Sequence, residues 1–181
     1  NPRDDCWSLA ERPGWLRLTA SIPVGKKGFW GACNTISQRI MGTGKGAAEA
    51  KLDLSGMRPG QQAGLVRFSV EYHLCGVRMT ETGQKRLFFN INGKVTTGPV
   101  IDADTLWIRT DNDGDRARFG WTFMSGGLRL SGDGPEFTLK FGKWCGDRLG
   151  FFCWNDEKPE GHIDVDYFHY SYDGPKASSG D

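Results

Sequence analysis

The sequence lacks the features that mark membrane proteins and nucleic-acid-binding proteins. It has no apolar run as long as a membrane span, and its first residues, Asn1 to Asp5, do not read as a signal peptide. The 23 lysines and arginines nearly balance the 22 aspartates and glutamates, which leaves a formal net charge of +1. Such a chain does not favour a nucleic acid or an anionic membrane as its partner, whereas an uncharged polymer suits it.

The cysteines are odd in number and irregularly spaced, which argues against a disulfide framework and a zinc site. They are Cys6, Cys33, Cys75, Cys145 and Cys153. An odd number leaves at least one free thiol, and a chain of 181 residues is long enough to bury a core without disulfides. No two cysteines have the Cys-x-x-Cys spacing of zinc ligands. This favours a reducing compartment, the cytoplasm; the alternative is a secreted parent protein.

Short alternating runs separated by glycine indicate many antiparallel strands. The chain has 26 glycines, and they fall between runs such as Leu106–Thr110 and Ala117–Met124. Asp113-Gly114 between these two runs predicts a tight hairpin. No segment shows a helical apolar stripe of useful length. The sequence therefore predicts one all-β domain over residues 1–174 and a flexible tail over residues 175–181.

The alternation also predicts which aromatic side chains point outward. Trp107 stands between two aliphatic residues that are expected to face the core, so its indole points away from it. Phe152 and Trp154 lie opposite Leu149 and Phe151 in the same way. A strand that is apolar on both faces needs a cover on its outer side. A third strand places three aromatics in the core: Phe119, Trp121 and Phe123.

Segments that look like phosphate-binding, calcium-binding or glycosidase motifs do not match the residue pattern that each motif requires. Gly42–Gly46 lacks the spacing of a phosphate-binding loop. Asp111–Asp115 suggests a calcium loop, but its glycine comes one place early and its twelfth position is Thr122, so a hairpin turn is the better interpretation. None of the acidic residues forms an evident pair of the kind that a glycosidase needs. Asp164 and Asp166 are expected to face solvent or to bond to neighbouring backbone.

Five strand-like segments follow one another in an order that carries a family resemblance: Arg12–Leu18, Asn34–Arg39, Ala48–Gly56, Ala63–Phe68 and Gly161–Tyr170. In the last segment Ile163, Val165 and Tyr167 alternate with Asp164 and Asp166, as in a half-buried strand. The chain resembles the C-terminal concanavalin-A-like β-sandwich of glycoside hydrolase family 43 β-xylosidases, also classed as carbohydrate-binding module family 91.

The resemblance implies a fold, a partner and the absence of catalysis. The fold is a two-sheet antiparallel sandwich of jelly-roll type. The catalytic carboxylates of such enzymes belong to a five-bladed β-propeller in the same polypeptide, so this domain is not expected to be an enzyme by itself. No cofactor is expected. Family relatives make a structural calcium ion conceivable, but no spacing in this sequence demands one.

Candidate sugar-binding residues follow from the chemistry of neutral sugars, which present flat C–H faces and hydroxyl groups. Proteins bind them with an aromatic platform and with planar polar side chains that bond to the hydroxyls. The candidate aromatics are Trp107, Trp154, Trp30 and Tyr72, and the candidate polar groups are Arg39, Arg67, Gln38 and Asn155. For each tryptophan the alternative is a place in the core, and for Arg39 it is a solvated strand face.

Trp144 is a candidate through the resemblance alone. In the family, an aromatic residue ahead of the strand that matches Leu149–Cys153 reaches the propeller and helps to close the substrate pocket. Lys143-Trp144-Cys145-Gly146 occupies that place here, with Trp instead of the usual Phe. The alternative is a strand-end tryptophan packed on its own sheet.

The sequence therefore predicts a non-catalytic accessory module of a xylan-degrading family 43 enzyme that binds xylan or xylo-oligosaccharides through exposed aromatics. The alternative is a structural domain that binds no glycan alone and only stabilises the propeller and completes its active site. A third possibility, a free-standing hydrolase, has no support from paired carboxylates.

Overall fold

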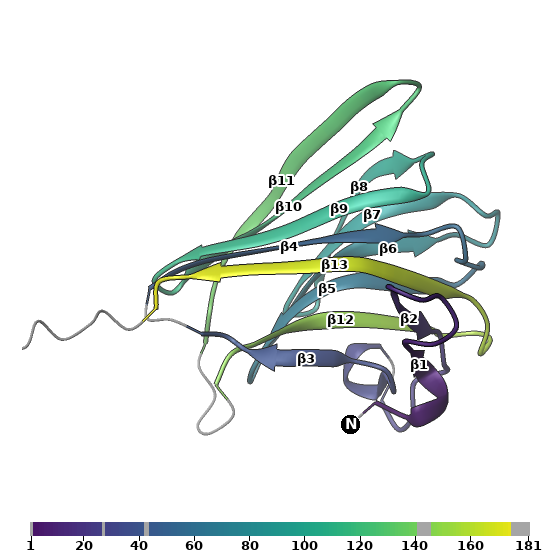
Figure 1. Cartoon of the computed structure of the whole chain (residues 1–181), viewed down its shortest axis with the longest axis horizontal. Helices are drawn as coiled ribbons and strands as arrows, with labels where there is room; N and C mark the ends of the chain where they lie inside the picture. Colours follow the sequence, from purple (N-terminus) through teal and green to yellow (C-terminus); the bar gives the residue numbers. More distant parts are fainter. Residues whose placement is uncertain (1, 27, 42–43, 141–145, 175–181) are drawn as a thin grey trace, which may run out of the picture.

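Two antiparallel β-sheets packed face to face make up the molecule (Figure 1). The computed structural model describes residues 2–26, 28–41, 44–140 and 146–174. Among these residues, no helix is long and apolar enough to cross a membrane. The expected all-β, two-sheet antiparallel sandwich is confirmed. The expected tail over residues 175–181 lies outside the described residues.

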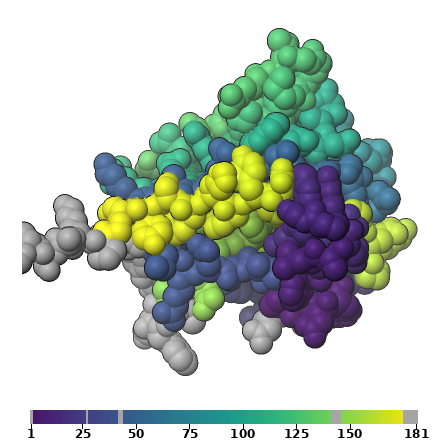
Figure 2. Space-filling model, viewed as in Figure 1, coloured from purple at the N-terminus to yellow at the C-terminus, as the bar shows by residue number. Residues whose placement is uncertain are grey.

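The larger sheet has seven strands in the order β1-β2-β13-β4-β9-β10-β11. Their bounds are β1 Trp7–Ser8, β2 Leu16–Thr19, β13 His162–Tyr172, β4 Lys45–Asp53, β9 Thr105–Asp113, β10 Arg116–Ser125 and β11 Leu128–Thr138. The last strand, β13, pairs with β2 on one side and β4 on the other. In Figure 2, β13 (yellow) accordingly crosses the visible face between the N-terminal residues (purple) and the green strands.

The smaller sheet has six strands in the order β3-β12-β5-β6-β7-β8. Their bounds are β3 Ile36–Arg39, β12 Arg148–Asn155, β5 Gln61–Phe68, β6 Tyr72–Met79, β7 Lys85–Ile91 and β8 Lys94–Ile101. Two short 3₁₀ helices, η1 (Asp4–Cys6) and η2 (Phe29–Gly31), lie in the segments ahead of β1 and β3.

The core lies between the sheets and is built by alternate residues of each strand. Ala48, Ala50 and Leu52 point inward from β4, while Glu49 and Lys51 point outward. The same alternation in β10 buries Phe119 and Phe123 and packs Trp121 against the core, as the sequence predicts. Removing these apolar surfaces from water is the main contribution to the stability of a sandwich.

A second, smaller apolar layer covers the outer face of the six-stranded sheet. Phe152 and Trp154 point out of that sheet from β12, and Phe29 of η2 packs over them. The sequence prediction that another part of the chain covers the outer face of β12 is therefore confirmed. The consequence of this cover is that the ring of Trp154 is not available at the surface.

Tight turns and protected edges complete the fold. Gly114 has φ of 61° in the loop that joins β9 to β10, so the predicted hairpin at Asp113-Gly114 is confirmed. The β10–β11 hairpin forms the upper end of the molecule in Figure 1. The edge strands β8 and β11 carry Pro99 and Pro135 respectively. A proline cannot donate a backbone hydrogen bond, which discourages pairing with the edge of another molecule.

Candidate functional site

A row of five side chains crosses the outer face of the seven-stranded sheet. Tyr167 on β13 pairs with Lys51 on β4, Lys51 with Trp107 on β9, Trp107 with Thr122 on β10, and Thr122 with Ser131 on β11. Paired residues on neighbouring strands are about 4.8 Å apart and point to the same face. These residues, here termed the outer row, therefore form a continuous strip of aromatic and polar groups.

Three members of the outer row, Tyr167, Trp107 and Thr122, line a hollow. The Trp107 hollow has a volume of about 300 Å³ and is lined by Glu49, Trp107, Thr122, Met124, Arg129 and Tyr167. Trp107 is half-buried, while Leu106 and Ile108 beside it are fully buried in the core. The predicted outward direction of this indole is thus confirmed. An aromatic ring that lines an open depression together with hydroxyl, carboxylate and guanidinium groups provides both apolar contact and hydrogen bonds.

Tyr167 and Glu49 form the polar side of the hollow. The Tyr167 hydroxyl donates a hydrogen bond of 2.7 Å to Glu49 Oε1, and its ring stacks on His169 with ring centroids 4.4 Å apart. Burial and, next, the bond to Glu49 raise the pKa of Tyr167 to about 12, so the phenol keeps its proton at neutral pH. The second oxygen of Glu49 remains an acceptor for a ligand hydroxyl.

A charged border runs beside the outer row. Arg109 on β9 donates a hydrogen bond of 2.8 Å to Asp133 on β11. Between these strands lies Gly120, and a Cβ atom there would collide with the side chain of Arg109. The glycine therefore leaves the space through which Arg109 reaches its carboxylate. The result is an ion pair that spans β9, β10 and β11 beside the outer row.

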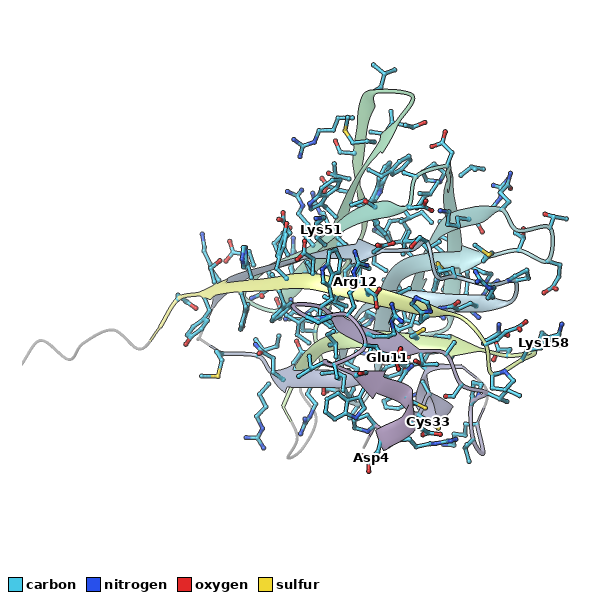
Figure 3. The ribbon with its side chains drawn as sticks, turned by 45° about the vertical axis from the view of Figure 1, so that its right-hand side comes forward. Asp4, Glu11, Arg12, Cys33, Lys51 and Lys158 are labelled. Atoms are coloured by element: carbon cyan, nitrogen blue, oxygen red, sulfur yellow. The ribbon has the colours of Figure 1, made fainter. Side chains whose placement is uncertain are left out.

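The other end of the same face holds an arginine and aspartate network. Arg12 and Lys51 lie on this face in Figure 3, and the Arg12 guanidinium sits 3.6 Å from the centre of the Trp15 ring. Arg17 bonds to Asp164 through Nε at 2.7 Å and Nη2 at 2.9 Å, and Arg12 adds a bond of 2.9 Å. Burial opposes ionisation of Asp164, but the bonds from the two arginines outweigh it and lower its pKa.

A second aromatic surface lies on the opposite side of the sandwich. Trp30 is 48 % exposed and packs edge-on against Tyr72, with ring centroids 5.7 Å apart. Phe29 lies 5.0 Å from Phe68 in a similar edge contact. These four residues form an aromatic cluster, three of whose members, Phe29, Trp30 and Phe68, line a hollow of about 500 Å³ that also includes Pro2, Thr35, Ser37 and Arg148.

Comparisons with known proteins agree with this architecture. A family profile described as the β-xylosidase C-terminal concanavalin-A-like domain matches residues 1–171. A β-xylosidase of Formosa agariphila is 48 % identical over 198 residues, which cover 99 % of this chain and 33 % of that protein. The chain belongs to the C-terminal concanavalin-A-like domain family of the β-xylosidases.

Solved structures share the fold of this C-terminal domain. An engineered family 43 glycoside hydrolase that displays endo-xylanase and exo-arabinofuranosidase activity superimposes with a TM-score of 0.80 at 25 % identity, over 94 % of this chain and 37 % of that one. The bifunctional GH43-CE protein of Bacteroides eggerthii also gives a TM-score of 0.80, at 24 % identity, over 94 % of this chain and 23 % of that one. This chain thus spans about a third of the xylosidase that it matches and is the non-catalytic domain.

Three of the predicted sugar-binding residues of this C-terminal domain are buried. Trp154 is only 2 % exposed, and its indole N–H bonds to Asp156 at 3.2 Å. The predicted direction of Trp154 was right, but the prediction that it is exposed is wrong because η2 and the residues near it cover that face. Asn155 is fully buried and shapes a turn: its amide donates to the Pro59 carbonyl at 2.8 Å, and its oxygen accepts the N–H groups of Glu157 and Lys158.

Arg67 is the third buried residue. It points into the interior at one end of the sandwich, is 1 % exposed, and pairs with Asp147 at 2.7 Å. A further bond of 3.1 Å joins it to Asn112 on the opposite sheet. Burial raises the pKa of Asp147, against the opposing effect of Arg67. The Arg67 guanidinium therefore links the two sheets through Asp147 and Asn112, and it is not available to a sugar.

The remaining predicted residues are spread over the molecule. Tyr72 belongs to the aromatic cluster on the six-stranded sheet. Gln38 and Arg39 are exposed on the edge strand β3 and do not line the Trp107 hollow. Trp144 lies outside the described residues. Of the seven predicted residues that the structure describes, the hollow therefore contains Trp107 alone.

A β-bulge explains why sequence reasoning missed Tyr167. Strict alternation places Tyr167 on the core side with Ile163 and Val165. The register of β13 against β4 shifts between Val165 and Tyr167, which turns Tyr167 to the outer face beside Lys51.

The prediction that Asp164 faces solvent or bonds to neighbouring backbone was also wrong. Its side chain is buried, with the residue 3 % exposed, and it pairs with arginine side chains. Glu49 points outward as its alternating run predicts, but nothing in the sequence pairs it with Tyr167.

The described residues offer no metal centre. No group of three or more histidine, cysteine, aspartate or glutamate side chains gathers within the ranges that the structure describes. Cys6, Cys33, Cys75 and Cys153 are free thiols. Burial raises the pKa of Cys75 well above its usual value, so this thiol is unreactive at neutral pH.

His73 is a buried titratable group near the Arg67 and Asp147 pair. It is 4 % exposed and stacks on Phe137 with ring centroids 4.3 Å apart. Its Nδ1 atom has no hydrogen-bond partner within the described part of the chain. Burial lowers the pKa of His73 to about 4, while Glu71 acts in the opposite direction and Arg67 and Lys140 reinforce the shift.

The free energy of unfolding should therefore fall between about pH 6.5 and pH 4. In this range the unfolded chain takes up a proton on His73 that the folded protein does not, and the contribution reaches about 3 kcal/mol at 1.36 kcal/mol per pKa unit. His73→Phe keeps a ring against Phe137 and should flatten this part of the pH profile in urea titrations. His169→Ala, at an exposed imidazole, is the control. A variant profile as steep as that of the wild type would refute the assignment.

Proposed function

We propose that this domain is an accessory carbohydrate-binding module of a xylan-degrading family 43 glycoside hydrolase, and that it binds xylan or xylo-oligosaccharides in the Trp107 hollow. The observation that carries the proposal is the half-buried indole of Trp107, which lines an open depression on the outer sheet face. No described segment of this chain fills that depression.

The hollow combines the two kinds of contact that a neutral sugar requires. The Trp107 ring offers an apolar surface for the C–H face of a pyranose. Tyr167, Glu49 and Thr122 surround it with hydroxyl and carboxylate groups for the sugar hydroxyls. The outer row continues across five strands, so a chain of several sugar units has further polar partners in Lys51 and Ser131.

The expected affinity for a linear xylan is modest. An open depression of about 300 Å³ buries only part of each sugar unit, and the sugar hydroxyls must give up water to bind. Because a linear xylan is uncharged, its binding should change little with salt concentration. The relatives support the choice of polymer, since the matched Formosa protein is named a β-xylosidase.

Calorimetry with xylo-oligosaccharides and affinity electrophoresis with xylan test the proposal. Trp107→Ala should weaken binding by about tenfold or more, equivalent to about 1.4 kcal/mol or more, because it removes the aromatic platform. The same change should leave the fold intact, since the indole is only half-buried. Trp30→Ala on the opposite sheet is the matched control and should bind like the wild type. Failure of the wild-type domain to bind any xylan would refute the proposal.

The aromatic cluster on the six-stranded sheet supports a second role, which is contact with the catalytic domain. Trp30 is large, apolar and 48 % exposed beside Tyr72 and Phe68. Exposed aromatic clusters are typical of protein interfaces. In the longer relatives this domain shares its polypeptide with the rest of the enzyme. The domain would have this structural role only if it binds no xylan by itself and if Trp30→Ala lowers the stability of the full-length parent enzyme.

A further inference from the structure

The basic side chains on the outer face of the seven-stranded sheet are paired with carboxylates, with one exception in the hollow. Arg109 bonds to Asp133 at 2.8 Å and Lys51 to Asp166 at 2.8 Å. The same holds for five other cations on this face, whose nearest carboxylates lie within 4.0 Å: Arg12, Arg17, Lys45, Arg116 and Arg118. Arg129, on β11, has neither a carboxylate nor a hydrogen-bond partner in the described part of the chain.

Arg129 stands at the rim of the Trp107 hollow. It pairs with Met124 on β10, and both residues line the depression on the outer face. Its side chain is exposed, so a ligand can reach the guanidinium without any rearrangement of the fold. A guanidinium presents several N–H groups in a planar fork, and this geometry matches a carboxylate with two parallel hydrogen bonds.

The acidic residue of the hollow does not cancel this charge. Glu49 lies on β4, and β9 and β10 separate that strand from β11. Three strand spacings correspond to about 14 Å between the two backbones, which exceeds the screening length of about 8 Å at physiological ionic strength. Glu49 also accepts the hydrogen of Tyr167, which draws its charge to the far side of Trp107. The two ends of the hollow therefore differ in charge.

From this asymmetry we propose that the Trp107 hollow selects xylan chains that carry a uronic acid branch, with Arg129 as the receptor for the sugar carboxylate. This inference rests on the proposed function and adds the class of polymer that the site prefers. A backbone sugar stacks on Trp107 while its acidic branch points toward β11. The Tyr167 and Glu49 end of the hollow then meets only neutral hydroxyls, with which a carboxylate acceptor is compatible.

The experiment compares two ligands of equal backbone length by calorimetry. One is a linear xylo-oligosaccharide, and the other is the same oligosaccharide with a single glucuronic acid branch. The wild-type domain should bind the branched ligand about five- to tenfold more tightly, as expected for a partly exposed charge-assisted bidentate contact. Raising the salt concentration should reduce this preference and leave the linear ligand nearly unaffected.

Variants then assign the preference to one side chain. Arg129→Met should make the affinities for the two ligands equal, because it removes the guanidinium that receives the branch carboxylate and keeps an apolar chain of similar length. Arg129→Lys should keep only part of the preference, because an ammonium group lacks the planar fork. Arg39→Met is the control, since Arg39 is likewise exposed but lies on β3 of the other sheet.

The outcomes separate the two claims. If the wild type binds both ligands equally, or if Arg129→Met keeps the preference, the inference about the branch is wrong while the proposed function stands. If the wild type binds neither ligand, the proposed function and this inference both fail. A preference that disappears only in Arg129→Met and weakens with salt supports the assignment.

Discussion

Replacing Trp154 with alanine should lower the free energy of unfolding by about 3–5 kcal/mol, the usual cost of truncating a buried aromatic side chain. The indole is 2 % exposed and lies in the apolar layer outside the six-stranded sheet, 4.9 Å from the Phe152 ring and bonded to Asp156. Alanine would leave a cavity under η2 and remove one of the two side-chain donors to Asp156, the other being Gln62. Urea denaturation at neutral pH measures the effect.

Trp107→Ala provides the contrast for this experiment. Both tryptophans point away from the core on strands that alternate in the same way, but only Trp107 is open to solvent. We expect Trp107→Ala to cost roughly 1 kcal/mol or less in stability, since a half-buried ring loses less transfer free energy. Equal losses in the two variants would show that the outer layer over Trp154 does not pack as described.

Replacing Arg67 with methionine should cost about 3–5 kcal/mol, because it leaves the buried carboxylate of Asp147 without its counter-charge. The side chains of the pair are 1 % and 4 % exposed, and Arg67 also holds Asn112 of the opposite sheet at 3.1 Å. A loss of this size is a large part of the 5–15 kcal/mol that typically stabilises a domain. Thermal and urea unfolding at pH 7 would measure it.

The double variant Arg67→Met/Asp147→Leu shows whether the unpaired charge is the cause. With both charged groups replaced by apolar ones, most of the lost stability should return. Arg39→Met is the matched single control at an exposed arginine and should leave unfolding almost unchanged. A double variant as unstable as Arg67→Met would mean that the bond to Asn112, and not the ion pair, is the important contact.

Alternation along the chain predicted the sheets and the direction of most side chains. It placed Phe119 and Phe123 in the core and Trp107 outside it, because residue parity depends only on the pleat of a strand. It even implied that something covers the outer side of β12. It did not reveal that the cover buries Trp154, because η2 comes from a loop more than a hundred residues earlier in the chain.

The polar part of the site was harder to predict for two physical reasons. Parity fails where a bulge inserts a residue, as it does ahead of Tyr167. Polar residue types also do not reveal burial: Arg67 and Asn155 suit a sugar site chemically, but their bonding groups are used by Asp147 and by backbone atoms. Such partners are distant in sequence, so only a three-dimensional structure brings them together.

The outer row is assembled from residues that the chain contributes at positions 51, 107, 122, 131 and 167. No hairpin cut from the domain contains more than two neighbouring members of it. The proposed sugar-binding surface consequently exists only after β13, the last strand in the chain order of the sheet, has joined β4. A sugar that binds this surface binds only the folded sheet. A saturating concentration of that sugar therefore stabilises the folded domain by mass action and raises its resistance to heat and to protease.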